Sequence, residues 1–228
     1  MNGALAEILG RVERGERLPP DPWLSIVPAP SARAEAVVAF PGHIVVATDL
    51  PPAWVRDQLP DGDLSAPLNP PFLHACEQKL GRRVNCVDGL YLAPRAAGPP
   101  QLPVREVADL DHPRVRRARR YRPEVRVWTA TLGVDCGPRK LRSSRTPPDV
   151  AGLLVVGRGL AGRWEAAIEV DPAHRGRGLG RALARAARHL VPEDRPVWAQ
   201  VSPGNATSVR TFLAAGYRPV GAEALLVP

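Results

Sequence analysis

Cysteine is scarce in this chain of 228 residues, and long apolar runs are absent. The three cysteines, Cys76, Cys86 and Cys136, form neither a disulfide framework nor a CxxC metal pair, so we expect a reducing, cytoplasmic location and no metal site. Because no apolar run approaches the ~20 residues of a membrane helix, we expect no membrane partner. The charged N-terminal segment favours an amphipathic helix over a signal peptide.

Lysine is also scarce: the 31 basic residues include only two lysines, Lys79 and Lys140, and the others are arginines. The net charge of +8 and the isoelectric point of about 10.4 favour an anionic partner. The arginines are densest at Arg114, Arg116, Arg117, Arg119, Arg120 and Arg122. Only one aromatic residue, Tyr121, lies among them, whereas single-strand binders stack bases on several aromatic side chains. A solvated helix face is therefore the favoured interpretation, and nucleic-acid binding is the weaker hypothesis.

Residues 1–95 have the pattern of a small α/β region. Apolar residues at helical spacing predict a helix within 1–17, and the runs AEAVVAF and HIVVATDL predict a strand pair. Two short helices are expected, one from Pro51 and one over 71–80, followed by a strand over 87–94. The Pro- and Gly-rich segment 95–103 is the expected boundary, so we predict a second domain over 103–228.

The apolar pattern of the second domain predicts strands and helices in the order β-α-β-β-β-α-β-α-β, which indicates a mixed α/β sheet. We expect Asp109 or Asp111 to cap a basic helix that runs to about Tyr121. Residues 135–149 are polar and interrupted by proline, so we expect a mobile hairpin loop there.

One glycine-rich segment, GRGLAG at 157–162, matches the GxGxxG pattern of dinucleotide-binding proteins. That fingerprint requires a helix that starts at the third glycine, but only eight residues separate Gly162 from Asp171-Pro172. Trp164 and the β-branched residues of this stretch favour a strand. We therefore expect a β-hairpin whose glycines form the turn.

A second glycine-rich segment lies between a predicted strand ending at Val170 and a predicted helix ending near Leu190. Glycines at 176, 178 and 180 allow the backbone N–H groups to point at one spot, at a helix N-terminus. Such a site suits a pyrophosphate, and the neighbouring arginines 175, 177 and 181 would add positive charge. The alternative is a simple strand-to-helix turn.

These residues resemble the acyl-CoA motif of the GNAT family of N-acetyltransferases, which is Gln or Arg, two residues, Gly, one residue, then Gly or Ala. The motif stands here as RGRGLG at 175–180, after Val170-Asp171-Pro172. The family's next strand–helix unit is also matched in order and spacing, by Asn205, Ser208, Phe212 and Gly216-Tyr217. The resemblance is clear over 150–228 and weaker back to about 103. Residues 1–95 would then be a degenerate second GNAT-like copy or a substrate wall.

The resemblance implies an α/β (mixed α+β) GNAT-like fold whose central sheet splays between strands 164–170 and 196–201, with an extra N-terminal α/β region. The pantetheine arm of acetyl-CoA would lie in the splay and the pyrophosphate on the loop. The cofactor-binding residues implied are Ile168, Val170, Arg175, Gly176, Arg177, Gly178, Leu179, Gly180, Arg181, Asn205 and Ser208. Asn205 would alternatively, or additionally, cap its helix by bonding the N–H of Thr207 or Ser208.

Acetyl transfer to an amine requires a group that accepts a proton and, in many members of the family, an acid for the leaving thiolate. Two positions depart from the family pattern: Phe212 stands where Tyr often serves as the acid, and Gln200 stands where N-terminal acetyltransferases carry Glu. Glu165 and Glu169 are the remaining candidate bases, with Glu169 favoured for its closeness to the cleft. Because they are four residues apart, an unbroken strand places both on one face.

We therefore expect an N-acetyltransferase that transfers acetyl from acetyl-CoA to a primary amine, in a small molecule or a protein lysine, by direct attack. The alternative is a non-catalytic acyl-CoA-binding regulatory module, which Phe212 and Gln200 favour. Homodimers are frequent in the family, so a homodimer is a further expectation. The acceptor carries no recognisable motif.

Overall fold

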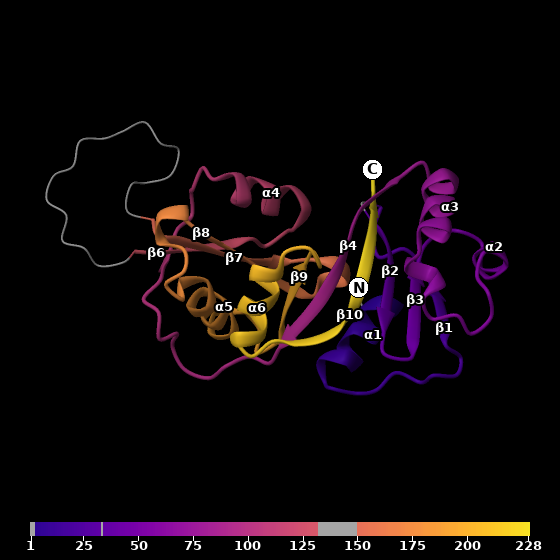
Figure 1. Cartoon of the computed structure of the whole chain (residues 1–228), viewed down its shortest axis with the longest axis horizontal. Helices are drawn as coiled ribbons and strands as arrows, with labels where there is room; N and C mark the ends of the chain where they lie inside the picture. Colours follow the sequence, from indigo (N-terminus) through magenta and orange to yellow (C-terminus); the bar gives the residue numbers. More distant parts are fainter. Residues whose placement is uncertain (1–2, 33, 132–149) are drawn as a thin grey trace, which may run out of the picture.

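The structure is a computed structural model that describes residues 3–32, 34–131 and 150–228. The loop expected over 135–149, with Cys136, lies outside these residues. Ten strands form one continuous sheet in the order β1-β3-β2-β10-β4-β9-β8-β7-β6-β5 (Figure 1). The sheet contains both parallel and antiparallel pairs, so the predicted mixed α/β architecture is confirmed.

The elements of the second part of the chain follow the predicted order, whereas the first part contains one strand more than predicted, β1, which pairs with β3. The strands are β1 (Leu24–Val27), β2 (Glu35–Phe40), β3 (His43–Ala47), β4 (Arg83–Ala93), β5 (Arg105–Glu106), β6 (Arg126–Ala130), β7 (Gly152–Arg158), β8 (Trp164–Val170), β9 (Val197–Val201) and β10 (Arg218–Val227). The α-helices are α1 (Ala4–Glu13), α2 (Pro52–Asp57), α3 (Pro70–Leu80), α4 (Pro113–Tyr121), α5 (Leu179–Leu190) and α6 (Ala206–Ala214). Three short 3₁₀ turns complete them: η1 (Ala66–Leu68), η2 (Leu160–Gly162) and η3 (Pro172–His174).

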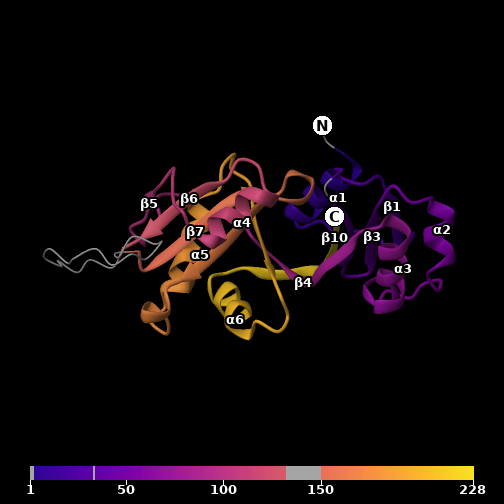
Figure 2. The ribbon, with the colours of Figure 1, turned by 90° about the horizontal axis from the view of Figure 1, so that it is seen from above.

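The last strand of each half lies within the sheet of the other half. Strand β4 comes from the N-terminal half and pairs antiparallel with β9. Strand β10 ends the chain and pairs antiparallel with β2 of the N-terminal half. The two exchanged strands also pair with each other, and they run side by side through the middle of the molecule (Figures 1 and 2). One hydrogen-bonded sheet therefore joins the two parts of the chain that lie on either side of the expected boundary at 95–103.

Helices cover both faces of the sheet. The apolar side of α5, including Leu183, packs on one face of β7 and β8 with α6 beside it. On the opposite face, α4 packs through Val115 against β6 and β7, and α1 packs through Leu9 against β2, β3 and β4. Alternate residues of β9 enter the two layers: Trp198 lies in the α1 layer and its neighbours lie in the α5 layer. The predicted amphipathic character of α1 and α5 is thus confirmed.

Two local predictions have different outcomes. The GRGLAG segment forms the turn of an antiparallel β7–β8 hairpin, as predicted. The prediction of an Asp cap for α4 was wrong, because the Nδ1 atom of His112 accepts the N–H of Arg114 at 3.1 Å. Asp111 instead forms an ion pair with Arg116 one turn into the helix. A histidine with a neutral acceptor nitrogen thus replaces the expected carboxylate.

The contact between β10 and β2 leads to a first prediction. A Cβ atom at Gly221 would lie 2.2 Å from the carbonyl oxygen of Ala39, so only glycine fits between the two backbones. We expect Gly221→Ala to lower the free energy of unfolding by about 1–3 kcal/mol, as other overpacking substitutions do. Chemical denaturation measures this change. Gly204→Ala is the matched control, because no atom lies within 4 Å of its added Cβ; equal stability of the two variants would contradict the prediction.

Candidate functional site

The parallel neighbours β8 and β9 diverge along their length. They are paired at one position, Glu165 with Trp198, whereas β8 stays paired with β7 as far as Val170. Beyond this position no pairing joins β8 to β9, so the edge of β8 faces the gap, and at its end the carbonyl of Val170 accepts from Nε of Arg175 at 3.1 Å. A cavity of about 900 Å³ opens at this point, between Ile168 on β8 and Val201 on β9. The predicted splay is confirmed, and an extended ligand with amide groups could pair with the free edge.

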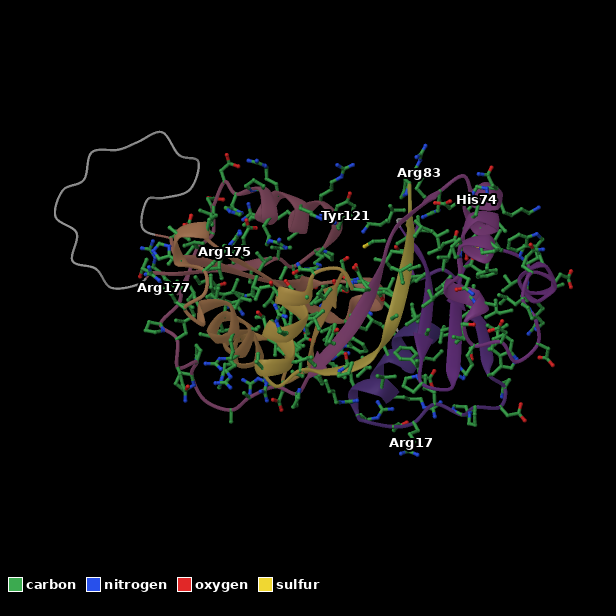
Figure 3. The ribbon with its side chains drawn as sticks, viewed as in Figure 1. Arg17, His74, Arg83, Tyr121, Arg175 and Arg177 are labelled. Carbon is green, nitrogen blue, oxygen red and sulfur yellow. The ribbon has the colours of Figure 1, made fainter. Side chains whose placement is uncertain are left out.

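A glycine-rich loop connects β8 to α5 near this cleft. Gly176 and Gly178 have φ angles of 74° and 80°, a left-handed region in which residues with a side chain are strained. Gly178 is the N-cap of α5, so the first N–H groups of this helix have no side-chain cap. The loop is exposed, and Figure 3 shows Arg175 and Arg177 at the same end of the molecule. The arrangement presents backbone donors and positive charge to an anion.

The predicted cofactor residues fall into two groups. Ile168, Asn205 and Ser208 line the cavity, whereas Val170 and the loop residues 175–181 lie outside its lining. Gly180 packs close to α6 and β8. The side chain of Leu179 is buried in the core, so this residue can contact a ligand only through its backbone. The Oδ1 atom of Asn205 accepts the N–H of Ser208 at 3.0 Å, which confirms the predicted helix cap.

The two aromatic residues of the second motif are structural. Phe212 lines the cavity, but it is 4% exposed and packs edge-on against Tyr217, with 4.9 Å between ring centroids. The hydroxyl of Tyr217 donates a hydrogen bond to the carbonyl of Ala184 at 3.1 Å. Burial raises the pKa of Tyr217 well above its ordinary value. The hydroxyl of Tyr217 is therefore buried and hydrogen-bonded within the core. Neither Phe212 nor Tyr217 presents a proton donor to the cleft.

Glu165 belongs to a buried array of charges where β8 and β9 separate. Its carboxylate accepts from the guanidinium of Arg163 at 2.8 Å and from that of Arg122 at 2.7 Å. Gly159 makes room for it, because a Cβ there would lie 2.0 Å from the carboxylate. Burial alone would raise the pKa of Glu165, but Arg122 and Arg163 outweigh it and hold the pKa below its ordinary value.

The array continues across β9 to β10. Arg163 donates to Glu223 at 2.7 Å, and the amide of Gln200 also donates to Glu223. The Oε1 atom of Gln200 accepts from Arg122 at 3.2 Å, which fixes the orientation of the amide. Gln200, Arg122 and Glu165 line the cavity, so the array forms part of the cleft floor.

Glu169 lies on the same face of β8 as Glu165, as predicted, but in a more open setting. Its carboxylate accepts from Arg114 of α4 at 2.7 Å, and its side chain is 38% exposed. Glu169 therefore has one guanidinium partner, whereas Glu165 has two.

The sequence analysis did not identify several residues at the site. Glu223, Arg163 and Arg122 complete the array, and Asp88 and Cys86 of β4 line the cavity. The only signal in the sequence was a carboxylate within the apolar end of the last strand, at Glu223. Asp88 carried no signal, because the pairing of β4 with β9 depends on the strand exchange.

The chain matches one protein-family model, described as the acetyltransferase (GNAT) family, over residues 149–217. A mycothiol acetyltransferase from Clavibacter sepedonicus is 55% identical over 53 residues, which are 23% of this chain. The chain's match spans only 17% of the length of that relative.

Two solved structures are similar to this chain at low sequence identity. A GCN5-related N-acetyltransferase from Kribbella flavida has a TM-score of 0.39 at 18% identity, covering 68% of this chain and 63% of that protein. A GCN5-related N-acetyltransferase from Sphaerobacter thermophilus has a TM-score of 0.40 at 15% identity, covering 69% of this chain and 56% of that protein.

Within residues 3–32, 34–131 and 150–228, no group of three or more His, Cys, Asp or Glu side chains could hold a metal ion. In the same part of the chain, no helix is long and apolar enough to cross a membrane.

The buried array leads to a second prediction. Glu165→Gln keeps the shape of the side chain but leaves Arg163 and Arg122 without their shared negative partner. We expect it to lower the free energy of unfolding by about 3–5 kcal/mol, as when one member of a buried ion pair is removed. The control is Glu124→Gln, whose carboxylate is 60% exposed and pairs with Arg158; a similar loss in the control would contradict the prediction.

The same substitution should also change how the free energy of unfolding depends on pH. Because the folded-state pKa of Glu165 lies below 4.5, its contribution is fully present above that pH and is lost as pH falls through the folded pKa. The wild type should therefore lose more stability than Glu165→Gln when denaturation is measured at about pH 3 instead of about pH 6. An identical loss in both proteins would show that Glu165 is not the group concerned.

Proposed function

We propose that this chain, which carries a GNAT-family acetyltransferase domain over residues 149–217, is an N-acetyltransferase that uses acetyl-CoA as its co-substrate. The observation that carries the proposal is the divergence of β8 and β9 beside a glycine-rich helix N-terminus. A free strand edge and an anion-binding loop at one cleft match the two ends of the acetyl-CoA arm, amide groups and pyrophosphate.

The residues at the cleft fit this donor. The N–H groups of residues 176–180, with Arg175, Arg177 and Arg181 nearby, would hold the pyrophosphate. The backbone of Ile168 and Val170 would pair with the pantetheine amides, in the manner of an added strand. Asn205 and Ser208 would border the arm at the start of α6.

The reaction we propose is direct attack of a primary amine on the thioester. The amine nitrogen forms a bond to the acetyl carbonyl carbon, the carbon–sulfur bond breaks, and one amine proton passes to a base. An N–H on the free edge of β8 would stabilise the oxyanion as it develops. Phe212 cannot donate a proton, so the departing thiolate of CoA would take its proton from water.

Glu169 is the better of the two candidate bases. Glu165 is buried between two guanidinium groups that lower its pKa, so it binds a proton poorly. Glu169 has a single arginine partner and is partly open to solvent, so water could connect it to the cleft. Glu165 would then act as a positioning residue for Arg122 and, through it, for Gln200.

The alternative is a non-catalytic acyl-CoA-binding module, which Phe212 and Gln200 favour because neither can exchange a proton. The two functions differ in turnover, because only an enzyme releases CoA when acetyl-CoA and an amine are both present. The acceptors to test include small amines, lysine peptides and, from the name of the Clavibacter relative, mycothiol. Acetyl-CoA binding without CoA release from any acceptor would favour the module.

A third prediction tests the donor site. Gly178→Glu forces a side chain into a left-handed position and places negative charge where the pyrophosphate would bind. We expect acetyl-CoA affinity, measured by calorimetric titration, to fall by at least about tenfold, or roughly 1.4 kcal/mol. The matched control is Gly62→Glu, an exposed glycine with a φ of 72° and no atom near its added Cβ. Unchanged affinity in Gly178→Glu would refute the proposed pyrophosphate site.

A fourth prediction tests the base. Glu169→Gln should reduce kcat by about 10²-fold or more, since an amide cannot accept the amine proton. Stopped or continuous assays of CoA release measure kcat. The control is Glu106→Gln, another partly exposed glutamate, paired with Arg126 at 2.7 Å. Normal kcat in Glu169→Gln would assign the proton to water or to another group.

A further inference from the structure

The cavity extends beyond the gap between β8 and β9, on the face of the sheet that carries α4. One wall is formed by α4, with Arg114, Arg117 and Tyr121, and the opposite wall includes Cys86 and Asp88 of β4. Figure 3 shows Tyr121 at the end of α4 nearest to β4. We call this extension, between α4 and β4, the trough. It approaches the cleft from the face opposite α5 and α6, so it provides a separate route for a second substrate.

Most charged side chains that line the cavity are already paired. Arg114 pairs with Glu169, Arg122 with Glu165, and Arg158 with Glu124. Two are exceptions within the part of the chain that the structure describes: Arg117 has no ion pair or hydrogen bond, and Asp88 has no ion pair. Asp88 accepts one weak bond, from the thiol of Cys86 at 2.9 Å.

Both side chains line the cavity, one from α4 and one from β4, and no ion pair joins them. Burial raises the pKa of the Cys86 thiol to about 12, and Arg117 is close enough for its charge to oppose that shift. The charge of Arg117 therefore lies within electrostatic range of the segment of β4 that carries Cys86 and Asp88. The trough thus presents one positive and one negative group, separated by space for a ligand.

Asp88 lies beside the reacting end of the cleft. Its neighbour Gly89 pairs with Val201, the last residue of β9, so Asp88 is about one strand spacing, ~4.8 Å, from the end of that strand. The register also places Asp88 opposite Glu223 of the buried array. Asp88 and residues 166–168 of β8 line the same cavity on either side of β9, so an amine held by Asp88 would share that cavity with the edge of β8 that receives the acetyl group.

We propose that the acceptor is an amine that also carries a carboxylate, an amino-acid-like molecule whose ammonium group binds Asp88 and whose carboxylate binds Arg117. This inference rests on the proposed acetyltransferase function and specifies its substrate class. A guanidinium binds a carboxylate through two parallel hydrogen bonds, which fixes orientation as well as charge. A ligand with both groups pairs with Asp88 and Arg117 at once, whereas a simple amine pairs only with Asp88.

Paired acceptors that differ only in the carboxylate test this proposal. The probes are glycine, L-alanine, L-phenylalanine and L-lysine, each compared with its carboxamide in an acetyl-CoA-dependent assay of CoA release. The wild type should have a kcat/KM at least about tenfold higher for the acids, equivalent to roughly 1.4 kcal/mol. Arg117→Met should raise KM for the acids about tenfold and leave the amides unchanged, which removes the preference.

Three further variants separate recognition from structure. Arg117→Glu should reverse the preference in favour of the amides, a result that loss of packing cannot produce. Asp88→Asn should raise KM for acids and amides alike, because both probes keep the amine. Arg120→Met is the matched control: Arg120 lies on the same helix, stacks over Tyr121 and does not line the cavity, so its kinetics should equal those of the wild type.

The outcomes distinguish this inference from the proposed function. Equal kcat/KM for acids and amides in the wild type, or an equal loss for both in Arg117→Met, would overturn the inference and leave the acetyltransferase intact. Acetyl-CoA binding by calorimetry without CoA release from any amine would overturn the acetyltransferase and this inference with it. A preference for acids that disappears in Arg117→Met and reverses in Arg117→Glu supports the inference.

Discussion

The antiparallel pairing of β4 with β10 is the contact on which the rest of the structure depends. Each strand ends one half of the chain and lies within the sheet of the other, so the backbone hydrogen bonds of both halves pass through this pair. The close approach of β10 to β2 at Gly221 belongs to the same arrangement. Because β9 is supported on its outer side by β4, the cleft wall formed by β9 is positioned by the N-terminal half of the chain.

The charges at the cleft follow from this arrangement. Where β8 and β9 separate, backbone pairing stops, and an array of two arginines, two glutamates and one glutamine joins β8, β9, β10 and the end of α4. Removal of one charge would leave a buried partner with fewer ion pairs than it has now, and breaking a buried pair in this way costs about 3–5 kcal/mol. The array therefore fixes Gln200 and Arg122 at the floor of the cleft. The half-exposed pair of Glu169 and Arg114 lies outside the array.

The two sides of the cleft differ in how they could be predicted. The donor side is encoded locally: the glycines at 176 and 178 need left-handed backbone conformations, and Asn205 needs only the next turn of its helix to act as a cap. The proposed acceptor side depends on distant segments, since α4 and β4 line the trough together. The His112 cap was missed for a related reason, because Asp111 was the better cap by type but its carboxylate pairs with Arg116.

The sequence by itself determined the periodic elements, their order, the glycine loop and the two motifs, because these depend on residues within a turn or a strand of one another. It also placed Glu165 and Glu169 on one face of β8, since the side chains of a strand alternate. Only the tertiary structure decided that the two halves exchange their last strands, that Glu165 is enclosed by Arg122 and Arg163, and that Asp88 lies beside the cleft. Strand neighbours and ion partners far apart in the chain are selected by the total burial and hydrogen bonding of the sheet, which no local pattern records.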